Sequence, residues 1–209
     1  NGAPRNLGGG SGRTVETFVG GADGISSSDR KHTRTGYYMR KFNNHRSGQN
    51  NSADGAIRLF RLAELYLNFA EAAYQSAGPD VTITEGNLSM SARDAVNAVR
   101  ARAKMPPLPA GLSNEDFERR YRNERRIELA FEEHRYFDVR RWKILSETDK
   151  FVTGMRIQKQ GETLAYSRFK LRNRNSFSDK YLLYPIDQDE VNKIFNLTGE
   201  NWQNPGWLD

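Results

Sequence analysis

The chain has 209 residues and a mass of 23.9 kDa, a length that accommodates one or two hydrophobic cores. Hydrophobic residues make up 36% of it and charged residues 28%, and no run approaches the roughly 20 apolar residues of a membrane-spanning helix, so the sequence predicts no such helix. The absence of cysteine excludes disulfides, thiolate metal sites and cysteine nucleophiles. The three histidines stand at separate places in the sequence, and we expect neither a metal site nor a cofactor.

The net charge of +6 comes mainly from the first segment of the chain. Residues 1–50 hold eight Lys and Arg against three Asp and Glu, whereas the other 159 residues hold 24 against 23. The same segment contains more than half of the 18 glycines and shows no amphipathic period. We interpret residues 1–55 as a Gly-rich, basic loop or connector. The alternative is an arm that contacts phosphates, but the chain as a whole does not predict a nucleic-acid partner.

Two amphipathic helices are predicted next, at 57–77 and 91–103. Apolar residues recur at the three-and-four spacing of one helical face, from Leu59 to Ala73 in the first helix and from Ala92 to Ala103 in the second. Gly78 and the proline after it predict the end of the first helix, and Ser91 begins the second as a capping residue. Together they indicate a helical hairpin of the tetratricopeptide kind, which needs neighbours to bury both of its faces.

A third long helix is predicted near 114–133, with a break near His134. Residues 56–145 therefore form the expected helical core. Residues 146–209 are expected to form a loop-rich C-terminal subdomain. Its short strands are predicted at 155–158, 166–171 and 180–186, followed by a short helix at 187–195 and a final turn. The predicted fold class is mainly α, with a tetratricopeptide-like hairpin (α-α superhelix type) and this irregular subdomain.

The most heavily charged stretch is "NERRIELAFEEHRYFDVRRW", residues 123–142. Glu124, Glu128 and Glu132 share one helical side, a geometry that would also suit a glycosidase. Arginines interleave with these carboxylates and would hold them in the charged form, which opposes the role of a general acid. We therefore predict no catalytic residues and no enzyme. The predicted structural ion pairs, partly or mostly buried, involve Glu128, Arg135, Asp138 and Arg141.

Several stretches together make the sequence resemble a known family. They are "TGYYMRKF" (35–42), "RLAELYLNFAEAAY" (61–74), "AVNAVRARAKMP" (95–106), the charged stretch above, and "YLLYPIDQDEVNK...NLTGENWQNPGW" (181–207). In this order they resemble the C-terminal part of the SusD/RagB family of outer-membrane glycan-binding lipoproteins. Two departures concern local backbone geometry: Glu133 stands where Gly is common, and Asp187 stands where Pro is common.

The resemblance implies a function. It implies a non-catalytic carbohydrate-binding component of an outer-membrane glycan-uptake complex, with an oligosaccharide and a SusC-like TonB-dependent transporter as partners. It further implies a location on the extracellular face of the outer membrane, through a lipid anchor that lies outside this chain. We also expect a longer protein whose upstream repeats cover the outer side of the first helix, where Phe60 and Leu65 stand. The alternative function is a tetratricopeptide-like scaffold for protein–protein interaction.

Residues that contact the glycan are predicted in and near a polar loop at 43–55. Amide side chains bond hydroxyl groups, although Asn and Gly are also ordinary loop formers. The candidates are Tyr37, His45, Arg46, Gln49, Asn50 and Asn51. Tyr38, Trp202 and Trp207 also offer aromatic faces to a sugar ring, but their place within family-like motifs favours a packing role. We expect this chain alone to bind glycan weakly or not at all.

Overall fold

The computed structural model describes residues 15–39, 41–42, 59–148, 150–174 and 178–207. The chain divides into two compact units, one formed by Ala56–Asp138 and the other by Asn1–Gly55 together with Val139–Asp209. In the described residues the fold is mainly helical with short strands, as the sequence predicts: there are six α-helices and two antiparallel two-stranded sheets. No helix in these residues is long and apolar enough to cross a membrane.

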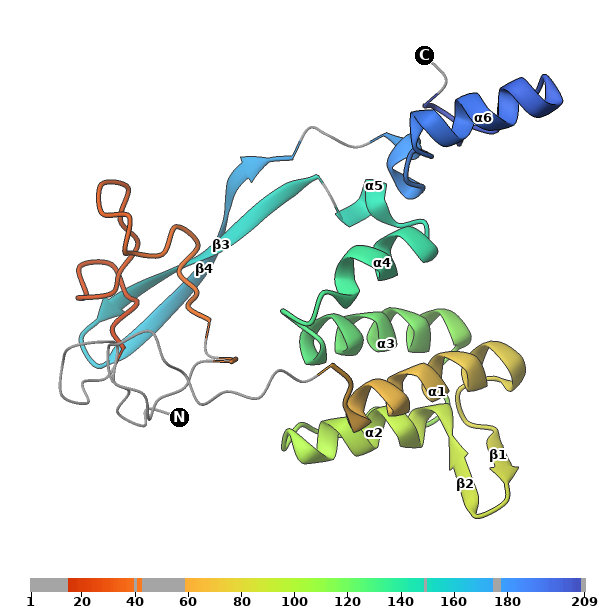
Figure 1. Cartoon of the computed structure of the whole chain (residues 1–209). Helices are drawn as coiled ribbons and strands as arrows, with labels where there is room; N and C mark the ends of the chain where they lie inside the picture. The colour runs from red at the N-terminus through yellow and green to blue at the C-terminus, as the bar shows by residue number, and fades with distance from the viewer. Residues whose placement is uncertain (1–14, 40, 43–58, 149, 175–177, 208–209) are drawn as a thin grey trace. The chain divides into compact units, whose positions relative to one another are not determined.

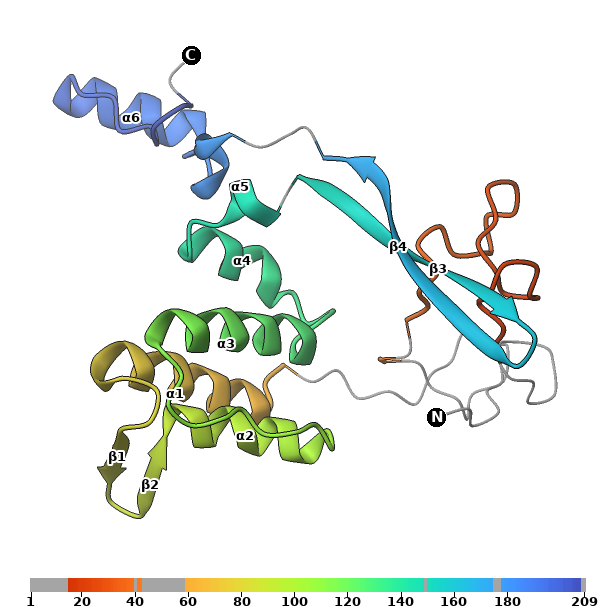
Figure 2. The ribbon, with the colours of Figure 1, turned by 180° about the vertical axis from the view of Figure 1, so that it is seen from behind.

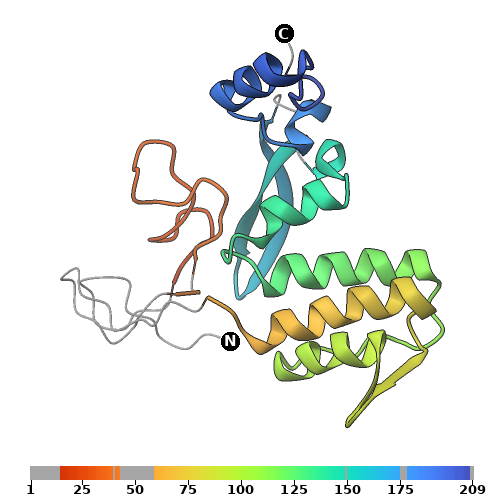
Figure 3. The same cartoon turned by 45° about the vertical axis from the view of Figure 1, so that its right-hand side comes forward.

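The helical unit contains three helices that lie side by side (Figures 1, 2 and 3). Its elements, in chain order, are α1 (Leu62–Ala77), β1 (Thr82–Glu85), β2 (Leu88–Ser91), α2 (Ala92–Arg102), α3 (Asn114–Glu128) and the first part of α4 (His134–Arg141). The β1–β2 hairpin occupies the connection between α1 and α2, with Glu85 paired to Leu88 around a two-residue turn. Residues 57 and 58 of the predicted first helix lie outside the described residues.

The helix ends that flank the connection of the helical hairpin, the end of α1 and the start of α2, are capped by local hydrogen bonds. Gly78 has a φ of 100°, and its amide donates to the Tyr74 carbonyl, which closes α1. The Ser91 hydroxyl accepts from the Asp94 amide while the Asp94 carboxylate accepts from the Ser91 amide, so the predicted capping box is present. The Ser91 hydroxyl also holds the pKa of Asp94 below its usual value. These caps set where α1 ends and where α2 begins.

The core between the helices is apolar and matches the predicted stripe of α1 only in part: Ala70 and Ala73 are buried as predicted. Leu67, Ala70 and Tyr74 are buried, whereas Leu59 and Leu62, which the sequence pattern placed in the stripe, are 92% and 63% exposed. The α2 stripe is confirmed from Ala92 through Val99. The rings of Tyr74, Phe117 and Tyr121 meet at centroid distances of 5.3 to 6.4 Å. These buried rings bring apolar surface of α1 and α3 into contact.

Beyond Tyr121 the packed side of α3 becomes ionic. Arg125 is 5% exposed, and its guanidinium donates to Asp138 at 2.8 Å and to Asn68 at 2.7 Å. Arg61 donates to Glu128 at 2.7 Å and to Glu132 at 2.6 Å. Glu128 also accepts from Arg102, and its side chain is 10% exposed. Charged pairs therefore continue the interface where apolar residues end.

Not every residue of the charged stretch is buried. Arg141 is exposed, contrary to expectation, and its guanidinium carbon lies 4.6 Å from the centroid of the Trp142 ring. Arg135 is half-buried, and burial lowers the pKa of its guanidinium. Phe131, which lies within the third helix predicted at 114–133, is 67% exposed, and Phe137 is 58% exposed. For Phe131 the reason is that α3 ends at Glu128 rather than at 133, so this residue leaves the packed face of the helix.

The turn between α3 and α4 has an unusual backbone. Phe131 and Glu133 have φ values of 63° and 66°, in the left-handed region that glycine adopts most easily. Glu133 stands at the position where the resembled family has Gly, so the departure noted in the sequence coincides with a left-handed residue. Asp187 has a φ of −53°, which proline also adopts, and its carboxylate caps α6 by accepting from the Asp189 amide.

The second unit carries the longer β-hairpin. Its elements are the end of α4, α5 (Leu145–Thr148), β3 (Phe151–Gln160), β4 (Thr163–Asn173), a 3-10 turn (Asp179–Leu182) and α6 (Gln188–Thr198). The two strands exceed the predicted short ones and pair directly with each other. The strand predicted at 180–186 is wrong: the chain forms the 3-10 turn there, and residues 183–186 belong to no strand.

The buried pair of Arg125 and Asp138 generates a stability prediction. Asp138→Ala leaves a buried guanidinium without its carboxylate, and we expect a loss of about 3 to 5 kcal/mol in the free energy of unfolding. Urea denaturation followed by circular dichroism measures it. The matched control is Asp116→Ala. It breaks the exposed pair between Asp116 and Arg119 within α3 and should cost less than about 1 kcal/mol. Equal losses in the two variants would show that Asp138 acts as a surface residue.

Candidate functional site

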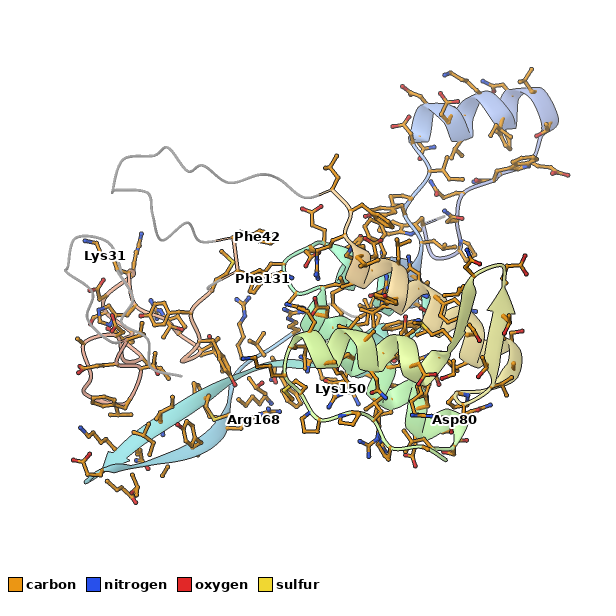
Figure 4. All side chains as sticks on the ribbon, turned by 90° about the horizontal axis from the view of Figure 1, so that it is seen from below. Lys31, Phe42, Asp80, Phe131, Lys150 and Arg168 are labelled. Carbon is orange, nitrogen blue, oxygen red and sulfur yellow. The ribbon has the colours of Figure 1, made fainter. Side chains whose placement is uncertain are left out.

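The β3–β4 hairpin presents two different faces. Paired residues of an antiparallel sheet share a face, and the pairs are Arg156 with Ser167, Gln158 with Ala165, and Gly154 with Phe169. Arg156, Gln158 and Phe169 therefore lie on one face. Arg168 pairs with Met155 and lies on the opposite face; it is marked on the hairpin in Figure 4.

The segment 15–39 is bonded to the outer edge of β3. The Val19 amide donates to the Ile157 carbonyl at 2.8 Å, and the Met155 amide donates to the Thr35 carbonyl at 2.7 Å. The two bonds lie two residues apart on the strand but sixteen residues apart on the segment. Residues 20–34 therefore form a loop whose two ends are held at neighbouring points of the same strand edge. Figures 1 and 2 show this segment, red to orange, beside the hairpin.

Glycine permits the close crossing at the second attachment point. Gly36 has a φ of 80°, and a Cβ atom there would lie 2.1 Å from the Met155 carbonyl oxygen. Across the strand, a Cβ on Gly154 would lie 2.6 Å from the Phe169 ring and 2.8 Å from the Thr35 carbonyl oxygen. Any larger side chain at either position would push the segment away from the hairpin.

Side chains within the segment fix the loop further. Asp23 is buried; its carboxylate accepts from the Glu16 amide at 2.9 Å, and its carbonyl accepts from the Tyr38 hydroxyl at 3.1 Å. The Tyr38 hydroxyl in turn accepts from the Thr33 amide. The His32 ring lies 3.0 Å from the Gly24 carbonyl through Nδ1. These bonds tie both halves of the loop together without regular secondary structure.

A cavity of about 420 Å³ lies between the loop and the hairpin, a size within the usual range for small-molecule sites. The hairpin contributes Arg156, Gln158, Phe169 and Leu171. The loop contributes Val19, Ile25, Ser26, Ser27 and Arg34. A second cavity of about 440 Å³, lined by 178–180 and 205–206, has no aromatic residue in its lining. We take the first cavity as the candidate site because apolar and hydrogen-bonding groups converge there.

The chemistry of this cavity suits a polar ligand with an apolar face. Phe169 is half-buried, and the Arg156 guanidinium carbon lies 5.5 Å from its ring centroid. The serine hydroxyls and the Gln158 amide donate and accept hydrogen bonds, and the two arginines donate only. An aromatic ring beside such groups matches a sugar ring, whose C–H face is apolar and whose rim carries hydroxyls. In the described residues no group of acidic or histidine side chains has the arrangement of a metal site.

The residues predicted from sequence to contact glycan are not in this cavity. Tyr37 is 55% exposed and lines neither cavity. The other five candidates, His45, Arg46, Gln49, Asn50 and Asn51, lie outside the described residues. Trp207 packs edge-on against Tyr181 at 5.6 Å and donates to the Lys180 carbonyl, whereas Trp202 is 56% exposed.

Sequence reasoning missed the cavity because its two walls are more than 100 residues apart along the chain. The available signals were the long alternation from Phe151 to Asn173 and the two glycines, Gly36 and Gly154, in otherwise unrelated segments. Neither the alternation nor the glycines indicate that the two segments lie side by side. Pairing between distant segments is a tertiary property that periodicity does not contain.

Comparison with protein-family models gives a match to the model of the SusD family over residues 11–207. No curated protein and no solved structure matches the chain. The matched range includes both walls of the cavity and the whole helical unit.

The crossing at Gly36 is testable. Gly36→Ala is expected to release the segment from β3, because the new Cβ would collide with the Met155 carbonyl. Faster hydrogen exchange at the Met155 amide, which otherwise donates to Thr35, is the readout. Gly20→Ala is the control, since Gly20 has a similar φ of 83° but open space around it. Both variants carry the left-handed penalty of about 1 to 2 kcal/mol, so only the collision distinguishes them. Equal exchange in both would disprove the close crossing.

Proposed function

Because the chain belongs to the SusD family, we propose that it is a non-catalytic carbohydrate-binding component of an outer-membrane glycan-uptake complex. The family is known for glycan binding in nutrient uptake. The observation that supports a binding site on this chain is the cavity between residues 19–34 and the β3–β4 hairpin. Its half-buried aromatic ring, two serines and one amide form the kind of surface that a saccharide requires.

The carboxylates of the charged stretch support a binding role rather than hydrolysis. Glycoside hydrolysis needs two carboxyl groups, one of which holds a proton to give to the leaving group. Glu124 accepts from Arg100, Glu128 from Arg61 and Arg102, and Glu132 from Arg61. All three carboxylates are thus engaged in ion pairs within the helical unit. These three acids therefore serve the packing of the helical unit.

The partners and location follow from the same proposal. A SusC-like TonB-dependent transporter is the proposed protein partner, and an oligosaccharide the ligand. The proposed location is the extracellular face of the outer membrane, with attachment through a lipid outside this chain. The polar loop at 43–55 stays a second proposed contact region, through His45, Arg46 and the amides from Gln49 to Asn51.

A tetratricopeptide-like interaction scaffold is the second candidate function. The observation in its favour is an exposed apolar surface at the start of α1: Phe60, just before the helix, is 56% exposed, and Leu62 and Leu65 within it are 63% and 49% exposed. The exposure of Phe60 and Leu65 agrees with the expectation from the sequence. An apolar helix face of this kind serves equally for a peptide partner or for additional helical repeats.

Replacing the aromatic ring of the cavity tests the proposed function. Phe169→Leu keeps an apolar side chain against Gly154 but removes the flat ring, and we expect at least a fivefold weaker retention of oligosaccharides. Affinity electrophoresis through gels containing a panel of polysaccharides measures retention. Tyr166→Leu is the control, because Tyr166 is exposed on the opposite face of the same strand.

Two outcomes would contradict the proposal. Release of new reducing ends during incubation with the polysaccharides would show an enzyme. Binding of peptides along α1, lost on Leu65→Ser, together with no retention by any polysaccharide, would favour the interaction scaffold.

A further inference from the structure

The candidate cavity holds two positive charges with no acidic partner among the described residues. Arg34 comes from the loop and Arg156 from β3, and both line the cavity. In the part of the chain that the structure describes, neither guanidinium has a carboxylate within ion-pair distance, whereas Arg61, Arg100, Arg102 and Arg125 all have one. The Arg156 guanidinium carbon lies 5.5 Å from the centroid of the Phe169 ring. The two guanidinium forks therefore remain available for a ligand.

The surroundings of the cavity add to this charge. The hairpin and its flanks, residues 150–174, contain seven Lys and Arg and one acidic residue, Glu162. The unit that includes the cavity, Asn1–Gly55 with Val139–Asp209, holds 20 Lys and Arg against 13 Asp and Glu, and the helical unit holds 12 against 13. The positive field of the protein thus belongs to the unit with the candidate site. Such a field raises the local concentration of anions.

We propose that the ligand of this cavity is an acidic oligosaccharide, whose carboxylate or sulfate group is bound by Arg34 and Arg156 while a sugar ring lies against Phe169. This inference rests on the proposed function and adds the ligand class to it. Guanidinium groups bind carboxylates and sulfates through two parallel hydrogen bonds, which a neutral hydroxyl does not provide. The lining also explains why a sugar is favoured over a bare anion: Phe169, Leu171 and Ile25 offer apolar contact that a bare anion does not use.

A membrane surface is a different anionic partner, and the geometry favours the saccharide. A membrane is bound by a flat or convex array of basic residues, whereas Arg34 and Arg156 lie in a hollow between two segments. The exposed row formed by Arg168, Lys170 and Arg172 lies on the other face of β4 and gives a natural control for non-specific attraction.

The experiment compares matched ligands with matched variants. The ligands are an oligosaccharide of uronic acid, the same oligosaccharide with its carboxyl groups reduced to alcohols, and a sulfated oligosaccharide of similar length. The variants are Arg34→Gln, Arg156→Gln and, as the control of equal charge change, Arg168→Gln. Titration followed by NMR yields dissociation constants even for weak binding, and circular dichroism confirms that these exposed substitutions leave the fold intact.

We expect the uronide to bind at least tenfold more tightly than its reduced form. Arg34→Gln and Arg156→Gln should each weaken uronide binding at least fivefold, and Arg168→Gln less than twofold. The sulfated ligand shows whether the site distinguishes sulfate from carboxylate; its binding with the same pattern of losses also supports the proposal.

Four results would overturn it. Equal binding of the charged and reduced oligosaccharides would remove the acidic ligand class but leave the proposed glycan binding in place. No binding of any saccharide would contradict both. Equal losses in Arg156→Gln and Arg168→Gln, or binding only to vesicles of anionic lipid, would assign the effect to general charge rather than to the cavity.

Discussion

One buried arginine determines how the helical unit closes. Arg125 lies on α3 where the aromatic contacts end, and its guanidinium joins Asn68 of α1 to Asp138 of α4. A guanidinium at this depth is tolerated only if its donors are paired, because an isolated charge in a low-dielectric interior is costly. The pair therefore fixes the start of α4 against α3, and the turn between them accepts two left-handed residues to reach that position. Apolar packing brings the helices together, and the ionic contacts specify how they end.

The second unit is built on a different principle. A two-stranded hairpin has little core of its own and is marginal in isolation. Here the segment 15–39 supplies the missing cover by bonding to the free edge of β3 at two points. The cover is incomplete, and the space that remains is the candidate site. The candidate cavity thus lies where an irregular loop covers a sheet. Strand alternation places Arg156 and Phe169 on the face that lines it.

Sequence reasoning worked where the controlling interactions are local. The capping box at Ser91, the stop at Gly78 and the break near His134 depend on residues within one or two turns, and they were predicted. Part of the buried face of α1 was missed, because Glu71, a buried carboxylate that accepts from the Tyr121 hydroxyl at 2.7 Å, counts as polar in any periodicity analysis. The net charge of residues 51–209 did not reveal the positive charge of the β3–β4 hairpin, because acidic residues elsewhere in that range balance it. The cavity required two distant segments, and no local pattern connects them.

The basic row on β4 also bears on how copies of the chain behave toward one another. In the described residues β4 has no second neighbouring strand, so one side of its backbone has no sheet partner. Such an edge is a template for pairing with the same strand of another molecule, and eleven residues is a long template. Arg168, Lys170 and Arg172 bring like charges to any such pairing. This row, which lies on the face of β4 opposite the candidate cavity, therefore disfavours edge-to-edge association of the strand with another copy.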